Sequence, residues 1–209
     1  MAVPLDKAKY EINIPLTAPG KQYMTLGLFR TRLWYAARRA GLHLDRDLTD
    51  SYATPERARA ELLRIAHRLY LSRDEAEKVA SRVFLERYGE GEVVQRAGTV
   101  PDAMRVILSG VASLALPTGD GTLLPVTDLR RDDLLGLTAL TRQAVAATAT
   151  AATDVAVLVV PVALVDTLVK LRPGLARDIG MAIDHRQELG ERALAAAGGS
   201  TDADSLVIS

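Results

Sequence analysis

The chain has 209 residues, of which 48% are hydrophobic and 25% charged, enough for one ordinary core and a smaller second unit. The absence of cysteine excludes disulfides and cysteine-based catalysis or metal sites, and we expect a cytoplasmic location. The 26 basic and 26 acidic residues cancel, but the first 72 residues hold 12 basic and 7 acidic ones. A modest basic excess is typical of a solvated face, so we expect no nucleic-acid partner.

No segment predicts membrane insertion or catalysis. Asp154 and Asp166 interrupt the apolar stretch 145–169, whereas a spanning helix needs about 20 predominantly apolar residues. The N-terminal residues lack the basic-then-apolar layout of a signal peptide. The histidines are not spaced as metal ligands, and Asp132-Asp133 reads as a structural turn. We therefore expect neither an enzyme nor a metal site.

Residues 1–50 predict a small strand-helix unit. Tyr10–Ile14 alternates like a strand at a sheet edge, and residues 15–20 break the pattern. A helix follows, and Gly41 caps its end. One face of this helix is apolar and carries Leu26, Phe29, Leu33, Ala37 and Ala40. A second face carries Arg32, Tyr35 and Arg39.

Residues 51–73 predict a helical connector. Thr54 is suited to cap a helix whose first residue is Pro55. Ser72 and Glu75 then form a capping-box pattern, which predicts that another helix begins there.

Residues 74–196 predict an α+β domain. Glycine-rich turns separate short apolar runs, which we expect to be strands over 84–88, 93–94, 104–108, 111–116, 123–129 and 155–160. Two helices should begin at Pro161 and Pro173, and the small, polar tail 197–209 should fray. The expected architecture is an antiparallel β-roll flanked by helices.

The segment between the last two strands resembles the phosphate-binding cassette of cyclic nucleotide-binding domains. The usual pattern is Gly-Glu-x-Ala-Leu, a loop, and then Arg-x-Ala-Thr before a closing strand. Gly136, Ala139 and Leu140 match the first half, and Ala147 and Thr148 match the second. The resemblance extends over the roll and its helices, and it implies that the last helix closes over a bound nucleotide.

The same resemblance shows two departures. Leu137 stands where the family has the glutamate that holds the ribose hydroxyl, and Val145 stands where it has the arginine that pairs with the cyclic phosphate. We therefore expect cyclic AMP to bind weakly or not at all. Arg142 either supplies the missing charge or is a solvated loop residue. The candidate ligand site comprises Gly136, Leu137, Thr138, Ala139, Leu140, Arg142, Ala147 and Thr148.

A second resemblance concerns the first helix. Arg30–Leu42, with its Arg-x-Arg-Leu-Trp-Tyr-Ala sequence, is similar to the end of the cytoplasmic domain of small-conductance mechanosensitive channels. Together the two resemblances imply the cytoplasmic part of a cyclic nucleotide-regulated channel of that family. The alternative is an ordinary amphipathic helix whose Trp34 packs locally.

Two functions remain open. In the first, a nucleotide or other small anion enters the roll, and the connector helices transmit the change to a channel or partner. In the second, the roll has no ligand and is an interaction or assembly module, for self-association or a channel part, with Leu137 and Val145 filling the former pocket. A transcription factor of the catabolite-activator type is disfavoured, because the 13 residues after Ala196 leave no room for a helix-turn-helix.

Overall fold

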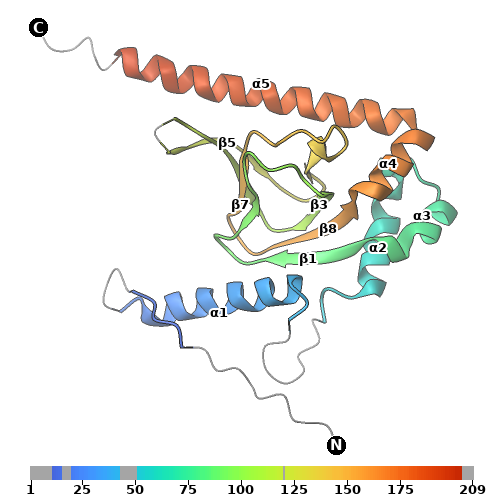
Figure 1. Cartoon of the computed structure of the whole chain (residues 1–209), viewed down its shortest axis with the longest axis horizontal. Coiled ribbons are helices and arrows are strands. Elements are labelled where there is room, and N and C mark those ends of the chain that lie inside the picture. The colour runs from blue at the N-terminus through green and yellow to red at the C-terminus, as the bar shows by residue number, and fades with distance from the viewer. Residues whose placement is uncertain (1–10, 16–19, 43–50, 120, 204–209) are drawn as a thin grey trace, which may run out of the picture.

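The computed structural model describes residues 11–15, 20–42, 51–119 and 121–203 (Figure 1). Its helical elements are α1 (Gln22–Arg39), α2 (Pro55–Ile65), η1 (Ala66–Leu69), α3 (Arg73–Val79), η2 (Ala80–Arg82), η3 (Leu137–Ala139), α4 (Val162–Leu171) and α5 (Pro173–Ala203). Its strands are β1 (Phe84–Tyr88), β2 (Val93–Gln95), β3 (Ala103–Ser109), β4 (Ala112–Pro117), β5 (Leu123–Leu129), β6 (Leu134–Leu135), β7 (Thr148–Ala151) and β8 (Val155–Pro161).

The strands form two four-stranded sheets that face each other as a β-roll. The strand orders are β1-β8-β3-β6 and β2-β7-β4-β5, and every pair is antiparallel. This confirms the expected α+β fold class with an antiparallel roll and flanking helices. The six expected strands are present to within a residue or two, and β1 and β5 have the expected bounds. Strands β6 and β7 were not among those expected.

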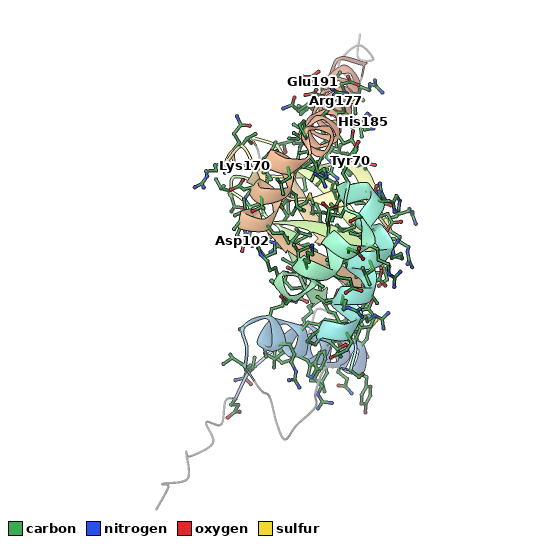
Figure 2. The ribbon with its side chains drawn as sticks, turned by 90° about the vertical axis from the view of Figure 1, so that its right-hand side faces the viewer. Tyr70, Asp102, Lys170, Arg177, His185 and Glu191 are labelled. Carbon is green, nitrogen blue, oxygen red and sulfur yellow. The ribbon has the colours of Figure 1, made fainter. Side chains whose placement is uncertain are left out.

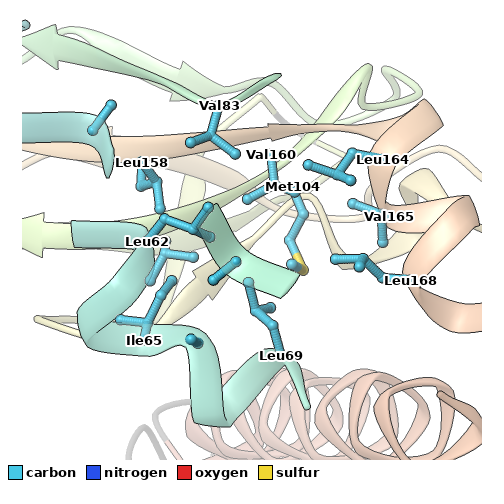
Figure 3. Packing of buried hydrophobic residues seen from close by; sticks show 14 of the residues in the cluster. Leu62, Ile65, Leu69, Val83, Met104, Leu158, Val160, Leu164, Val165 and Leu168 are labelled. Carbon is cyan, nitrogen blue, oxygen red and sulfur yellow. The ribbon is translucent and has the colours of Figure 1, made fainter. Parts of the chain in front are cut away.

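Strand β8 is buried on both faces and divides the core in two. Leu158 and Val160 join a cluster formed with the helices on one side of the sheet (Figure 3). Val157 and Val159 join a second cluster between the two sheets. Because successive side chains of a strand point to opposite faces, one continuous apolar run serves both cores.

The two connector helices begin as the sequence predicts. Thr54 Oγ1 accepts a hydrogen bond from the backbone N–H of Arg57 at 3.2 Å. Both bonds of the Ser72 and Glu75 capping box are present at the start of α3. These helices pack with α4 and the start of α5 against the sheet.

Helix α1 contacts the roll through its polar and aromatic face. Tyr35 is buried, and Arg39 Nη2 lies 2.6 Å from Glu92 Oε1. The guanidinium of Arg39 also lies over the ring of Tyr88, at 4.2 Å from its centroid. Leu26 and Leu33, from the apolar face, are exposed. Charge pairing and cation–π contacts therefore decide which side of this helix meets the roll.

The two ends of the chain depart from expectation. Residues 11–15 have no regular secondary structure, so the expected strand is not formed there, and Tyr10 lies outside the described residues. Pro161 ends β8 and precedes the first turn of α4 rather than belonging to it. Helix α5 continues past residue 196 to Ala203, so residues 197–203 are helical and not frayed as expected, and residues 204–209 lie outside the described residues. Within the described residues, no helix is both long and apolar enough to span a bilayer.

The position of Gly136 generates the first prediction. Gly136 has φ +70°, and a Cβ there would lie 2.2 Å from the carbonyl oxygen of Ala103. Gly98 has a similar φ of +78° with open space around its Cβ position. Both alanine substitutions incur the backbone strain of about 1–2 kcal/mol, but Gly136→Ala also forces the turn away from β3, which costs roughly 1–3 kcal/mol more.

Urea unfolding of both variants measures the difference. We expect Gly136→Ala to lower the free energy of unfolding by clearly more than Gly98→Ala does. Equal losses would show that the turn moves freely away from β3.

Candidate ligand-binding site

The cassette begins with a tight turn against strand β3. Gly136 adopts the left-handed conformation and precedes η3, which is one turn of 3₁₀ helix. Leu137 points into the core formed with the helices and is only 4% exposed. The turn is therefore fixed by backbone contact on one side and by apolar burial on the other.

The side chain of Gln95 joins the two halves of the cassette. Its Oε1 accepts a hydrogen bond from the backbone N–H of Gly136 at 2.9 Å. Its Nε2 donates to the carbonyl oxygen of Ala147 at 3.2 Å. One N–H of the phosphate-type turn is thus already used inside the protein.

A cavity of about 500 Å³ lies between the cassette, strands β4 and β5, and helix α5. Pockets that bind small molecules usually measure roughly 300–1,000 Å³. Its apolar walls come from Leu114, Leu116, Val126, Leu137, Val145, Ile183 and Leu194. Its polar side chains are Gln95, Thr138, Gln143, Arg186, Gln187 and Glu191. Leu137 and Val145 therefore form part of the wall and leave the cavity open.

The structure brings together only part of the site expected from the sequence. Four of the expected residues line the cavity: Gly136, Leu137, Thr138 and Ala147. The other four, Ala139, Leu140, Arg142 and Thr148, are outside its lining. Ala139 is buried, and Leu140 packs against the helical core. Thr148 Oγ1 accepts a hydrogen bond from the N–H of Ala97 at 3.1 Å, while Arg142 is exposed with φ +54°.

Helix α5 contributes functional candidates that the sequence reasoning missed. Arg186 donates from Nη2 to the carbonyl oxygen of Leu134, just before the cassette turn. Burial lowers the pKa of Arg186, and the negative charge of Asp133 opposes this effect. A signal was available, because Ile179, Ile183, Arg186 and Gly190 have helical spacing and put an arginine on an otherwise apolar face.

Gly190 lets α5 approach the roll closely. A Cβ on this residue would lie 3.1 Å from Leu116 Cδ1 on strand β4. The helix therefore covers the cavity at short range, with no side chain of its own between the two surfaces at this position.

The turn before the cassette is held by charged groups from the connector helices. Arg64 Nη2 lies 2.6 Å from Asp132 Oδ1, and Arg68 Nη1 donates to the Asp132 carbonyl oxygen at 3.0 Å. Asp133 Oδ2 accepts from the N–H of Arg130 at 2.7 Å. The two aspartates thus have the structural role expected from the sequence. Within the described residues, no cluster of three or more potential metal ligands is present.

The start of α5 is tied to the same connector helices. Tyr70 follows η1, and its hydroxyl donates to Asp178 Oδ2 on α5 at 2.9 Å. Arg172, between α4 and α5, pairs with Glu75 of α3. In Figure 2, Tyr70 lies beneath α5, which carries Arg177, His185 and Glu191. Both walls of the cavity, the cassette and α5, are therefore connected to the same helices.

The Gln95 bridge leads to the second prediction. Gln95→Ala leaves the N–H of Gly136 without its acceptor, which should cost about 1–3 kcal/mol of unfolding free energy. Gln143→Ala is a matched control, since Gln143 is an exposed glutamine on the same cavity; it should cost under about 0.5 kcal/mol. Urea denaturation compares the two, and similar losses would mean that Gln95 does not hold the cassette together.

The Arg64–Asp132 pair leads to the third prediction. The hydrogen bond from Arg64 is the main reason why the pKa of Asp132 lies below its ordinary value. This stabilisation is complete above the unfolded pKa of about 3.9 and is lost as pH falls through the lower folded pKa. Arg64→Gln should therefore destabilise by roughly 0.5–1 kcal/mol at pH 7, because the pair is partly solvated, and the difference should shrink at pH 3.

Arg130→Gln is the control for that experiment. Arg130 pairs with Asp128 at 3.7 Å on an exposed surface, so its loss should change little at either pH. An Arg64→Gln deficit that stays constant between pH 7 and pH 3 would assign the effect to packing of the arginine stem.

Comparisons with known proteins agree with this geometry. Residues 85–171 match the family model of the cyclic nucleotide-binding domain. No curated protein matches the chain. The sensor domain of the transcriptional regulator DNR from Pseudomonas aeruginosa has a similar structure, with 18% identity and a TM-score of 0.53, over 63% of this chain and 91% of that one.

Two other solved structures have similar folds. One is the regulatory subunit of a cAMP-independent protein kinase A from Trypanosoma cruzi bound to guanosine, with 20% identity and a TM-score of 0.54, covering 69% of this chain and 52% of that one. The other is the catabolite activator protein of Thermus thermophilus, with 19% identity and a TM-score of 0.52, covering 63% of each. Residues 85–171 of this chain thus match the cyclic nucleotide-binding domain model, and the chain shares the fold of these regulatory proteins.

Proposed function

We propose that the chain is a non-enzymatic regulatory domain that senses a nucleotide or other small anion in the cavity beneath α5. The open cavity of about 500 Å³ is the observation that carries this proposal. An interaction module without a ligand would be expected to fill its pocket with aliphatic side chains. Leu137 and Val145 line the cavity instead, which favours ligand sensing over that alternative.

The connector helices provide a route by which binding is transmitted. Arg64 and Arg68 hold the turn at Asp132 before the cassette, and Tyr70 holds Asp178 at the start of α5. A ligand that contacts both the cassette and α5 favours one spacing of these two elements. That spacing is then imposed on α2, η1 and α3, which lead back along the chain to α1.

The proposal places the partner that receives the signal at helix α1. The resemblance of Arg30–Leu42 to the end of a mechanosensitive channel's cytoplasmic domain supports a channel or channel-like partner at α1. The exposed apolar residues of α1, among them Leu26 and Leu33, are compatible with such a contact or with self-association.

The fourth prediction tests the cavity with small ligands. Cyclic AMP should bind with a Kd weaker than micromolar, which corresponds to less than about 8 kcal/mol, because neither Leu137 nor Val145 replaces the family's charged contacts. Adenosine and guanosine belong to the same test, since a protein of similar fold is bound to guanosine. Binding is measured by NMR titration to millimolar concentrations.

Blocking variants show whether any binding uses this cavity. Ala146 is an exposed residue on its lining, so Ala146→Trp should obstruct it and abolish binding. Ala152 is exposed and outside the lining, so Ala152→Trp should bind as the wild type does. Failure of every ligand to perturb the wild-type spectrum would reject nucleotide sensing and favour the interaction module.

A further inference from the structure

Arg186 is a charged side chain on the packed face of α5. It is half-buried, lines the cavity, and donates one hydrogen bond to the carbonyl oxygen of Leu134. An arginine has five N–H donors and remains protonated at neutral pH. Within the described part of the chain, no carboxylate lies within ion-pair distance of it. The guanidinium therefore has N–H donors beyond its one hydrogen bond, and it forms no ion pair with Asp133 or with Glu191, which lines the same cavity.

The cassette itself has little left with which to hold an anion. The N–H of Gly136 is bonded to Gln95, and Thr148 Oγ1 accepts from Ala97. Val145 is apolar, and Arg142 lies outside the cavity lining. Among the described residues that line the cavity, Arg186 is the single cation. Any counter-charge for an anionic ligand must then come from α5.

Thr138 supplies an independent observation on the other side of the cavity. Its Oγ1 is the single buried side-chain oxygen or nitrogen without a hydrogen-bond partner among the described residues. A buried hydroxyl without a partner costs free energy, so such groups usually mark a missing water or ligand. Thr138 belongs to the cassette turn and lines the same cavity as Arg186.

We propose that Arg186 is the anion-binding residue of this domain, so that the counter-charge sits on the covering helix instead of the cassette. The ligand then carries a compact oxyanion, a phosphate or carboxylate, toward Arg186, with Thr138 as a hydrogen-bonding partner. Its apolar body lies against Leu114, Leu116 and Leu194. This inference rests on the proposed function, because it concerns the same cavity.

Burial makes this assignment energetically reasonable. Loss of solvation lowers the pKa of Arg186, which means that its charged form is less stable there than in water. An oxyanion restores the lost stabilisation, and charge-assisted hydrogen bonds to guanidinium are among the strongest in proteins. The negative charge of Asp133 offsets only part of this loss.

The test uses cyclic AMP and adenosine, which share base and sugar and differ in the phosphate. Wild-type protein should bind cyclic AMP about ten- to a hundredfold more tightly than adenosine. Arg186→Gln should remove that preference and leave adenosine affinity within about twofold. Arg186→Lys should keep part of the preference. Arg177→Gln, at an exposed site on the same helix and outside the lining, should behave as the wild type.

Two outcomes overturn the assignment while the ligand-sensing function survives. One is equal binding of cyclic AMP and adenosine by the wild type. The other is a preference that persists in Arg186→Gln but disappears in Arg142→Gln, which would make Arg142 the anchor. Either result separates a failure of this inference from a failure of the cavity to bind nucleotides at all.

Simple anions test whether Arg186 binds an anion even if neither cyclic AMP nor adenosine binds. Thermal unfolding is followed with increasing inorganic phosphate or acetate at constant ionic strength. The wild type and Arg177→Gln should be stabilised more than Arg186→Gln by at least one anion. A response to phosphate alone indicates a phosphorylated ligand, and a response to acetate alone indicates a carboxylate. Identical responses of wild type and Arg186→Gln to both anions would reject Arg186 as an anion-binding residue.

Discussion

The burial of strand β8 on both faces is the constraint on which the rest of the structure depends. Residues 155–160 are all buried, and their side chains alternate between the helical core and the core between the sheets. Strand β3 pairs with β8, and the cassette turn at Gly136 lies directly against the backbone of β3 at Ala103. The position of the candidate site is therefore set by the most buried strand, and a shift in this pairing would move both cores and the cassette together.

The site combines a familiar fold with different side chains at two positions of the cassette. The cassette turn and the roll lie within the region that matches the cyclic nucleotide-binding domain model, while aliphatic side chains stand at the two positions where the resemblance implies charges. The cavity is open although these two positions carry no charge, and Gln95 joins the two cassette halves with side-chain hydrogen bonds. The other polar side chains that line the cavity are Thr138 and Gln143 from the cassette segment and Arg186, Gln187 and Glu191 from α5.

The sequence predicted the fold well because its signals are local. Alternating or continuous apolar runs between glycine-rich turns define β1, β5 and β8, and Thr54 and Ser72 mark the helix starts. Contacts between distant segments could not be predicted in the same way. The side of α1 that meets the roll depends on Arg39 reaching Glu92, and Gln95 and Arg186 join the cassette from 41 and 52 residues away. The helical spacing around Arg186 indicates that it lies on a packed face, but the neighbouring sequence does not identify the partner of Arg39, Gln95 or Arg186.

If the domain is a sensor, a counter-charge on the covering helix has a different physical effect from a charge in the cassette. If the cassette alone holds a ligand, the helix responds only to the apolar surface that the ligand offers. If α5 carries the charge, the ligand must also contact the cassette, here through Thr138, before it can fix the spacing of the two elements. A ligand shifts a conformational equilibrium only through its differential affinity for the two states. The bond between ligand and Arg186 would contribute that difference directly, because it forms only when α5 covers the cavity.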